Sequence, residues 1–275
     1  MLKETFHIAV PTAFFDDESL NVQGTIEYIN HLYKQGIKSV LVSGSTGEQH
    51  SLNLREKIEL VKSLEVECDL MNNMEIIFGV SSIRQKEAEE LAMAISNTKI
   101  SGILLGYSPY VLPTQEEALV YTKTIINYSN KPTILYNNPK RTGFDLSVTS
   151  IAELSSIDLV VGLKEAGDKA KIRLLKKEIN RNNFHYYAGG ELELEEKVLQ
   201  GFDRLSSIAG NISPLEIRNY FQKLLVKETI SEQERANIEV IFQQVNQGSP
   251  IVNLKKVLNQ NGFKMGVCRK PIGNV

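Results

Sequence analysis

The chain has 275 residues, of which 42% are hydrophobic and 23% are charged, and its formal net charge is −2. These values are ordinary for a globular protein and give no sign of the basic surface that nucleic-acid-binding proteins carry. No stretch approaches the roughly 18 apolar residues of a membrane-spanning helix, and the start, MLKETFHIAVPT, lacks the apolar core of a signal peptide. We therefore expect a cytoplasmic protein that binds neither nucleic acid nor membrane.

Eight short apolar segments recur along the chain and are rich in Val, Ile and Tyr. They span residues 6–12, 38–44, 75–81, 102–108, 131–138, 158–165, 184–190 and 204–211. Both alternating sets of side chains are apolar, as in parallel strands that are covered on two faces. We therefore predict eight buried strands.

Amphipathic helical patterns lie between these segments. One opens with Asn53 and has Glu56 three residues later, and another opens with Thr114 and has Glu117 at the same spacing. Both pairs are typical of a capping box at a helix start. Eight strand–helix units in roughly 210 residues predict a (β/α)8 TIM barrel. A doubly wound open sheet is the alternative, but SGSTGEQ lacks the G-x-G-x-x-G spacing of its phosphate-binding turn.

The alternation stops near residue 213, and three helical patterns follow it. We predict a barrel over residues 1–212 and a three-helix extension, packed on the barrel, over residues 213–275.

Polar residues collect where the predicted strands end, which is where barrel enzymes place their active sites. The candidates, in chain order, are Ser45, Thr46, Gly47, Tyr110, Tyr136, Arg141, Lys164, Gly189 and Ser206. A lysine can form an imine with a carbonyl compound, a tyrosine can carry a proton, and an arginine can bind a carboxylate with two hydrogen bonds. Each residue alone also has a purely structural interpretation. Their joint occurrence at strand ends favours a site for a small carboxylated carbonyl compound.

Lys164 ends the segment DLVVGLKEAG, whose other residues are mostly apolar. Its amine could simply reach water or pair with Glu165. Alternatively, burial could favour its neutral form and make it a nucleophile. Strand alternation places Lys164 on the inner face of the barrel and Glu165 on the outer face. Such imine chemistry requires neither a metal nor an organic cofactor.

The sequence resembles the dihydrodipicolinate synthase / N-acetylneuraminate lyase superfamily of class I aldolases. The matching motifs are GSTGEQHSL, YNNPKRTG and GLKEA, with further support from GNISP and CRKPIG. The resemblance implies that Lys164 forms a Schiff base with pyruvate and that Tyr136 and Thr46 relay protons. It also implies that Ser45 or the adjacent amides hold the pyruvate carboxylate, and that Arg141 binds the carboxylate of a second substrate.

The motif YNNPKRTG is most similar to the synthase branch, which joins pyruvate to aspartate semialdehyde in lysine synthesis. The resemblance also implies a homodimer or homotetramer, in which a loop tyrosine reaches the neighbouring subunit. Here the loop SPYVLPTQEE offers Tyr110 alone, where two tyrosines are typical. Another Schiff-base aldolase or dehydratase acting on a sugar acid or hydroxy-keto acid, and a keto-acid-binding barrel without turnover, therefore remain alternatives.

Overall fold

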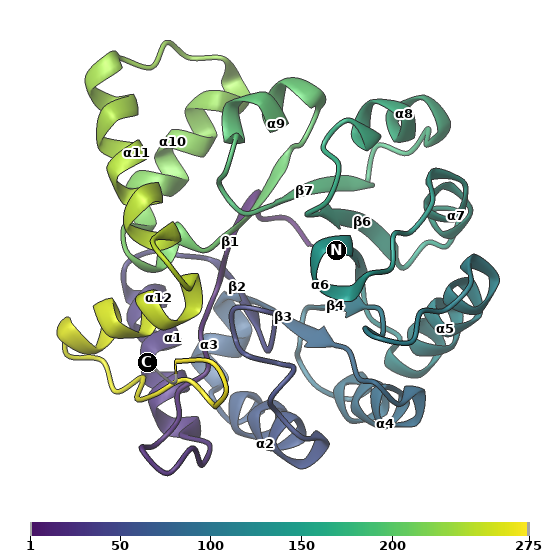
Figure 1. Cartoon of the computed structure of the whole chain (residues 1–275). Helices are drawn as coiled ribbons and strands as arrows, with labels where there is room; N and C mark the ends of the chain where they lie inside the picture. The colour runs from purple at the N-terminus through teal and green to yellow at the C-terminus, as the bar shows by residue number, and fades with distance from the viewer. Residues whose placement is uncertain (1, 274–275) are drawn as a thin grey trace.

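The computed structural model describes residues 2–273 and folds them around a barrel of parallel strands (Figure 1). Each strand pairs with its neighbours in chain order, and the first pairs with the eighth, so that the sheet closes. All eight predicted strands are confirmed, and each is shorter than the apolar segment that predicted it. They are β1 (Phe6–Ala9), β2 (Ser39–Val42), β3 (Glu75–Val80), β4 (Gly102–Gly106), β5 (Thr133–Asn137), β6 (Val160–Glu165), β7 (His185–Gly189) and β8 (Arg204–Ser207).

Helices alternate with the strands and surround the barrel, as Figure 1 shows. They are α1 (Val22–Lys34), α2 (Leu54–Glu65), α3 (Cys68–Asn73), α4 (Gln85–Ser96), α5 (Gln115–Ser129), α6 (Pro139–Thr142), α7 (Val148–Leu154), α8 (Lys171–Glu178), α9 (Leu194–Gln200), the 3-10 helix η1 (Ala209–Asn211), α10 (Pro214–Val226), α11 (Glu232–Asn246) and α12 (Pro250–Gln260). The predicted TIM barrel with C-terminal helices is therefore confirmed. In residues 2–273 no helix is both long and apolar enough to cross a membrane.

Both predicted capping boxes are present. At the start of α2, the Asn53 side chain accepts a hydrogen bond from the Glu56 N–H at 3.0 Å, and the Glu56 carboxylate accepts one from the Asn53 N–H at 2.9 Å. Thr114 and Glu117 make the same reciprocal pair of bonds at the start of α5. These bonds satisfy N–H groups that a helix start otherwise leaves without partners, and they fix where both helices begin.

The two faces of the sheet pack into separate apolar clusters. Side chains on the outer face join the surrounding helices in the larger cluster. Side chains on the inner face form a smaller one inside the barrel: Leu2, Ala9, Leu41, Ile77, Leu104, Ile134, Val161 and Tyr187. The interior is therefore a packed core, and ligands can approach only at its ends.

Strand β6 contains a bulge opposite β5. Val160 pairs with Thr133, whereas Gly162 pairs with Ile134, so that one residue of β6 has no partner of its own on β5. Such a bulge shifts every later residue of the strand by one position relative to its neighbour. It therefore decides which side chains at the end of β6 face the interior.

The three helices expected after residue 213 are present as α10, α11 and α12. The first of them follows β8 in the chain and contacts β1 and α9, so it takes part in the ring of helices around the barrel. The division of the chain at residue 212 thus stays a prediction. In Figure 1, α12 and the segment after it lie near α1, at one side of the barrel.

Candidate active site

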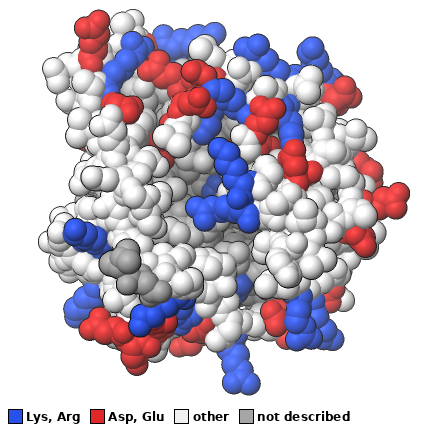
Figure 2. Space-filling view, in the orientation of Figure 1, with Lys and Arg blue, Asp and Glu red and all other residues white. Residues whose placement is uncertain are grey.

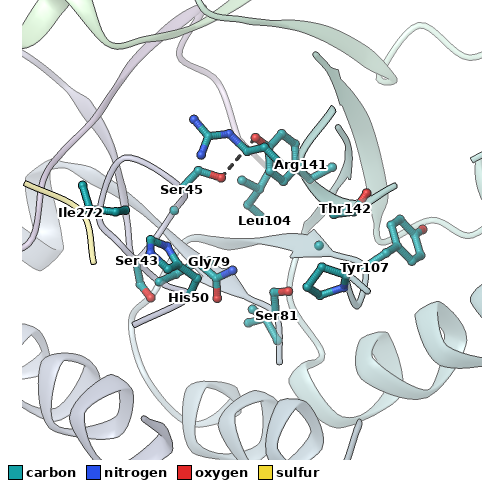
Figure 3. A pocket seen from close by; sticks show the side chains of 16 residues that line it. Ser43, Ser45, His50, Gly79, Ser81, Leu104, Tyr107, Arg141, Thr142 and Ile272 are labelled. Carbon is teal, nitrogen blue, oxygen red and sulfur yellow. Dashed lines mark hydrogen bonds between the residues drawn. The ribbon is translucent and has the colours of Figure 1, made fainter. Parts of the chain in front are cut away.

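A cavity of about 300 Å³ opens where the first half of the barrel strands end (Figure 3). Its walls come from the ends of β2 to β5 and the loops that follow them. Polar side chains that line it include Ser45, His50, Ser81 and Arg141, and Ile272 of the C-terminal segment covers one side. The cavity is therefore small, partly enclosed and equipped with hydrogen-bonding groups, as sites for small metabolites are.

Charged side chains are unevenly distributed around the hollow on the face of the barrel where the strands end. Figure 2 shows Lys and Arg side chains reaching over the hollow near the centre of this face, while Asp and Glu side chains gather along its upper rim. Positive charge at such a concave site attracts small anions, including carboxylates. Within residues 2–273, no group of three His, Cys, Asp or Glu side chains is placed to hold a metal ion.

Lys164 lies next to this cavity, at the end of β6. The bulge brings it opposite Tyr136 of β5, and it also pairs with Tyr187 of β7. Its side chain is buried, and Nζ lies 4.9 Å from the centre of the Tyr136 ring, which lines the cavity. Burial lowers the pKa of Lys164; the nearby Tyr136 and Glu191 oppose this shift, and Arg141 adds to it. The amine is therefore neutral more often than that of a solvated lysine.

Glu165 faces away from Lys164, as strand alternation predicts. Its carboxylate accepts hydrogen bonds from the Asn137 side chain at 2.8 Å and from the Gly167 N–H at 2.6 Å. Burial raises the pKa of this carboxyl group, although the two hydrogen bonds oppose the shift. Glu165 thus belongs to the layer between the barrel and its helices and does not hold the amine in its charged form.

The Tyr136 hydroxyl meets two polar side chains. Its Oη lies 3.3 Å from Ser45 Oγ, and Asn138 Nδ2 donates to it at 2.7 Å. Burial alone would raise the pKa of Tyr136, but Lys164, these two hydrogen bonds and Arg141 together lower it. The phenol therefore releases its proton more readily than a free tyrosine, which suits a group that carries protons.

The hydroxyl beside Tyr136 belongs to Ser45, and not to Thr46 as the resemblance led us to expect. A dashed line in Figure 3 marks the hydrogen bond that Ser45 makes. Thr46 is buried and does not line the cavity. Because the two residues are neighbours in a tight turn, their side chains point in different directions, and only the first reaches the phenol.

Unusual backbone geometry explains the shape of this turn. Ser43 and Glu48, which flank it, both have φ of +53°, in the left-handed region that side chains with a Cβ rarely adopt. Gly47 is closely surrounded: a Cβ there would lie 3.2 Å from the Ser43 nitrogen and from Thr12 Oγ1. The Thr12 hydroxyl donates to the Gly47 carbonyl at 2.7 Å. Gly47 thus lets the turn pack directly against the segment after β1.

A buried ion pair ties the same turn to the C-terminal helices. The Nζ atom of Lys255 in α12 lies 2.6 Å from Glu48 Oε1. The side chain of Lys255 is 2% exposed and that of Glu48 is 0% exposed. The Arg269 N–H donates to the other Glu48 oxygen at 3.0 Å, and its guanidinium pairs with Glu56. Helix α12 and the segment after it therefore fix the turn that carries Ser45.

Arg141 stands between two cavities. It is an exposed residue of α6 that lines the 300 Å³ cavity together with Ser45 and Tyr136. It also lines a larger, polar cavity of about 920 Å³ beside the ends of β6 and β7, where Glu191 and Lys197 contribute. Its guanidinium can therefore bind an anionic group of a ligand in either space.

Gly189 and Ser206 lie away from the smaller cavity. They pair with each other across β7 and β8, and Gly189 lines the larger cavity. A Cβ at Gly189 would approach that of Ala166 to 2.7 Å, so the backbone here is closely packed. Ser206 is buried, and its Oγ has no hydrogen-bond partner among the described residues.

Tyr110 does not join the cluster around Lys164. Its side chain is 93% exposed and its φ is +79°, so the loop holds it outward in a backbone conformation that is rare for tyrosine. In this arrangement the Tyr110 hydroxyl cannot relay protons to the site of its own subunit. A role in a neighbouring subunit stays a prediction.

Sequence reasoning missed Asn138 and Glu191. Asn138 stands two positions after Tyr136, and this spacing on a strand could have placed both on one face. Glu191 is buried, and its carboxylate accepts hydrogen bonds from the Ser207 hydroxyl and the Ala209 N–H. Nothing in the sequence around Glu191 distinguishes it from a surface acid, because its partners come from the end of β8 and the start of η1.

Comparisons with known proteins relate this chain to proteins of the same fold. A 4-hydroxy-tetrahydrodipicolinate synthase of Methanosphaera stadtmanae is 29% identical over 286 residues, and the match covers 99% of this chain and 93% of the relative. Another, of Oceanobacillus iheyensis, is 26% identical over 268 residues, and the match covers 96% of this chain and 89% of the relative. The dihydrodipicolinate synthase structure from Aquifex aeolicus superposes with a TM-score of 0.90 at 20% identity, covering 98% and 92% of the two chains. The structure of the Acinetobacter baumannii enzyme complexed with pyruvate superposes with a TM-score of 0.87 at 26% identity, with the same coverage.

The family profile extends over almost the whole sequence. It describes the Dihydrodipicolinate synthetase family and matches residues 4–275. The matched range contains the Ser45 turn, Tyr136, Arg141 and Lys164, together with the C-terminal helices that hold the turn. The chain therefore belongs to the dihydrodipicolinate synthetase family, whose members are class I, pyruvate-dependent aldolases and lyases.

Proposed function

We propose that this protein is a 4-hydroxy-tetrahydrodipicolinate synthase that condenses pyruvate with L-aspartate semialdehyde during lysine biosynthesis in the cytoplasm. The observation that carries the proposal is the buried Lys164 amine, 4.9 Å from the ring of Tyr136, whose hydroxyl contacts Ser45. The names of the relatives support this choice of reaction within the family.

The first step joins pyruvate to Lys164. The neutral amine attacks the keto carbon, its nitrogen then loses one proton and the keto oxygen takes one up, which gives a carbinolamine. A second proton, delivered through Tyr136 and Ser45, lets that oxygen leave as water and gives a protonated imine. The Ser45 hydroxyl or the adjacent backbone N–H groups of Thr46 and Gly47 hold the pyruvate carboxylate. Because Gly189 and Ser206 lie away from the smaller cavity, their part in substrate binding stays a prediction.

The second step makes the new carbon–carbon bond. Loss of a proton from the methyl group converts the imine to an enamine, whose carbon attacks the aldehyde carbon of the second substrate. The aldehyde oxygen takes up a proton, which Tyr136 can supply. The amine of the second substrate then attacks the imine carbon, closes the ring and releases Lys164.

Replacement of Arg141 by Leu is expected to raise KM for aspartate semialdehyde roughly 10- to 100-fold. This range corresponds to the loss of one or two hydrogen bonds to a charged group. KM for pyruvate should change much less, because Arg141 is proposed to bind only the second substrate. Steady-state kinetics with each substrate varied in turn measure both constants.

Lys140→Leu is the matched control for this prediction. Lys140 is exposed, carries the same charge and lines the larger cavity but not the smaller one. It should leave both constants nearly unchanged. If Arg141→Leu raised KM for pyruvate and KM for aspartate semialdehyde equally, Arg141 would instead attract both anions to the site without binding one of them specifically.

We also propose that the protein forms a homodimer or homotetramer in which Tyr110 enters the site of a neighbouring subunit. An apolar surface lies exposed beside this residue. Val111 is 75% exposed, Leu112 is 48% exposed and Ile83 is 76% exposed, and all three line one surface pocket together with Tyr110. Contiguous exposed apolar surface of this kind favours contact with another protein surface.

A second candidate function is cleavage or dehydration of a sugar acid or hydroxy-keto acid through the same imine. The observation that favours it is the larger cavity, whose polar wall contains Arg141, Glu191 and Lys197 and could accommodate a longer polar substrate. The chemistry at Lys164 would be unchanged, and only the electrophile that meets the enamine would differ.

One assay separates the candidates, including a barrel that binds keto acids without turnover. The protein is incubated with pyruvate and with or without aspartate semialdehyde, and pyruvate consumption and cyclic product are followed. Consumption that requires the semialdehyde supports the synthase. Release of pyruvate from hydroxy-keto acids, with no consumption in the first assay, would favour the second candidate. A pyruvate adduct without turnover in either assay would leave only binding.

A further inference from the structure

Asn138 uses its side chain in an unusual way for its position at the start of α6. Asparagine before a helix commonly accepts a hydrogen bond from a backbone N–H of the first turn, as Asn21 does at α1 and Asn53 at α2. The Asn138 side chain makes no such bond. Only its backbone carbonyl serves the helix, by accepting from the N–H groups of Arg141 and Thr142 at 3.0 Å each.

The amide of Asn138 is directed instead to Tyr136. Its Nδ2 donates to the phenol oxygen at 2.7 Å, and Asn138 is 7% exposed, so that water competes little for this bond. Asn137, the residue between them, faces the other way and donates to Asp145 and Glu165. Two adjacent asparagines, the last residue of β5 and the residue that follows it, therefore direct their side chains to different partners.

We infer that Asn138 is a positioning residue for Tyr136, because its N–H holds the phenol oxygen in place and stabilises the negative charge that remains when the proton leaves. One lone pair of Oη accepts from Asn138, so the hydroxyl proton and the second lone pair are left for exchange with Ser45. A donor that binds an anionic oxygen favours its charged form. The consequence for turnover rests on the proposed function, but the effect on Tyr136 does not.

The ionisation of Tyr136 tests this inference without any substrate. The protein is labelled with ¹³C at the ζ carbon of tyrosine and titrated by NMR, and the signal of Tyr136 is identified by its absence in Tyr136→Phe. In Asn138→Leu, which removes the donor, the titration midpoint of Tyr136 is expected to rise by roughly one pH unit or more. Asn138→Asp keeps the shape, replaces the donor by an acceptor and should raise the midpoint at least as much.

Asn137→Leu is the matched control, because it removes the neighbouring amide, which points away from Tyr136 and bonds to Asp145 and Glu165. It should lower stability without moving the Tyr136 midpoint. An unchanged midpoint in Asn138→Leu and Asn138→Asp would overturn the inference. An equal shift in Asn137→Leu would also overturn it, since general loosening of β5 would then explain the change.

A kinetic readout connects the inference to turnover. The rate of pyruvate adduct formation is followed against pH in the wild type and in Asn138→Leu. The fall of this rate at high pH, where Tyr136 loses the proton that it delivers, is expected to move upward with the titration midpoint of Tyr136. Absence of an adduct in the wild type would count against the proposed function alone, because the NMR titration would still decide the role of Asn138. Adduct formation with an unshifted pH profile would overturn the part of the inference that concerns catalysis.

Discussion

Replacement of Lys164 by Met is expected to abolish covalent capture of pyruvate and to reduce turnover by roughly 10³-fold or more. The side chain keeps a similar length and apolar stem but loses the nucleophile. The measurement is incubation with pyruvate, reduction with borohydride and mass spectrometry of the digested protein, which locates the added three-carbon unit. Circular dichroism of the variant establishes that the barrel is intact.

Lys57 provides an internal comparison for this experiment. It is also a buried lysine, and burial lowers its pKa to about 8, although nearby carboxylates oppose the shift. Its Nζ, however, donates to the Ser81 carbonyl at 2.9 Å and to the Gln49 side chain at 3.2 Å, so its hydrogen bonds hold the amine within the wall of the cavity. The adduct should therefore map to Lys164. A pyruvate adduct on Lys57, or one that persists in Lys164→Met, would contradict the assignment.

Adduct formation should also depend on pH in a defined direction. Burial is the largest cause of the lowered pKa of Lys164, so the reactive neutral amine becomes populated at lower pH than in a solvated lysine, whose pKa is about 10.4. The rate constant for adduct formation should rise with pH and reach half its maximum below that value. Stopped-flow mixing with pyruvate across the pH range measures this midpoint, and a midpoint at or above the ordinary value would contradict the expected burial of the amine.

Replacement of Lys255 by Met is expected to destabilise the protein by about 3–5 kcal/mol, because it leaves the Glu48 carboxylate buried without its partner. Both side chains of this pair are almost fully buried. Activity should fall as well, since Glu48 closes the turn that carries Ser45. Urea unfolding followed by circular dichroism gives the change in stability, and the assay proposed above gives the change in turnover.

Three further variants make this prediction specific to the ion pair: Lys256→Met, Glu48→Gln, and Glu48→Gln combined with Lys255→Met. Lys256→Met changes the next residue of α12, which is exposed, and should alter stability by less than about 0.5 kcal/mol. Glu48→Gln combined with Lys255→Met should recover part of the loss, because the buried charge is then removed. A loss in the double variant equal to the sum of the two single losses would mean that the pair does not interact.

Local patterns in the sequence were sufficient for most of the fold. The eight strands follow from apolar segments of the right length, and the capping boxes at Asn53 and Thr114 follow from residues three positions apart. The location of the candidate site at the strand ends follows from the architecture. The opposite orientations of Lys164 and Glu165 follow from strand alternation, because the bulge in β6 lies before both residues.

Contacts between distant segments, and small differences in direction within one turn, could not be derived in this way. Whether Ser45 or Thr46 contacts the Tyr136 hydroxyl depends on the left-handed backbone at both ends of the turn. The residue types at Ser43 and Glu48 do not predict this conformation. The pairing of Lys255 with Glu48 joins segments that no local pattern relates. A buried lysine in an amphipathic helix looks like any surface lysine until its partner is known.

The attachment of the C-terminal segment to the Ser45 turn also has a consequence for protein synthesis. Arg269, which bonds to Glu48, is made 221 residues after it, and Ile272, which covers one side of the cavity, is made later still. A nascent chain can therefore contain all eight strands, Lys164 and Tyr136 while its ligand site is still unfinished. Under the proposed function, such a chain would not capture keto acids until translation has passed the barrel and α12, which would delay chemistry at Lys164 until the site is whole.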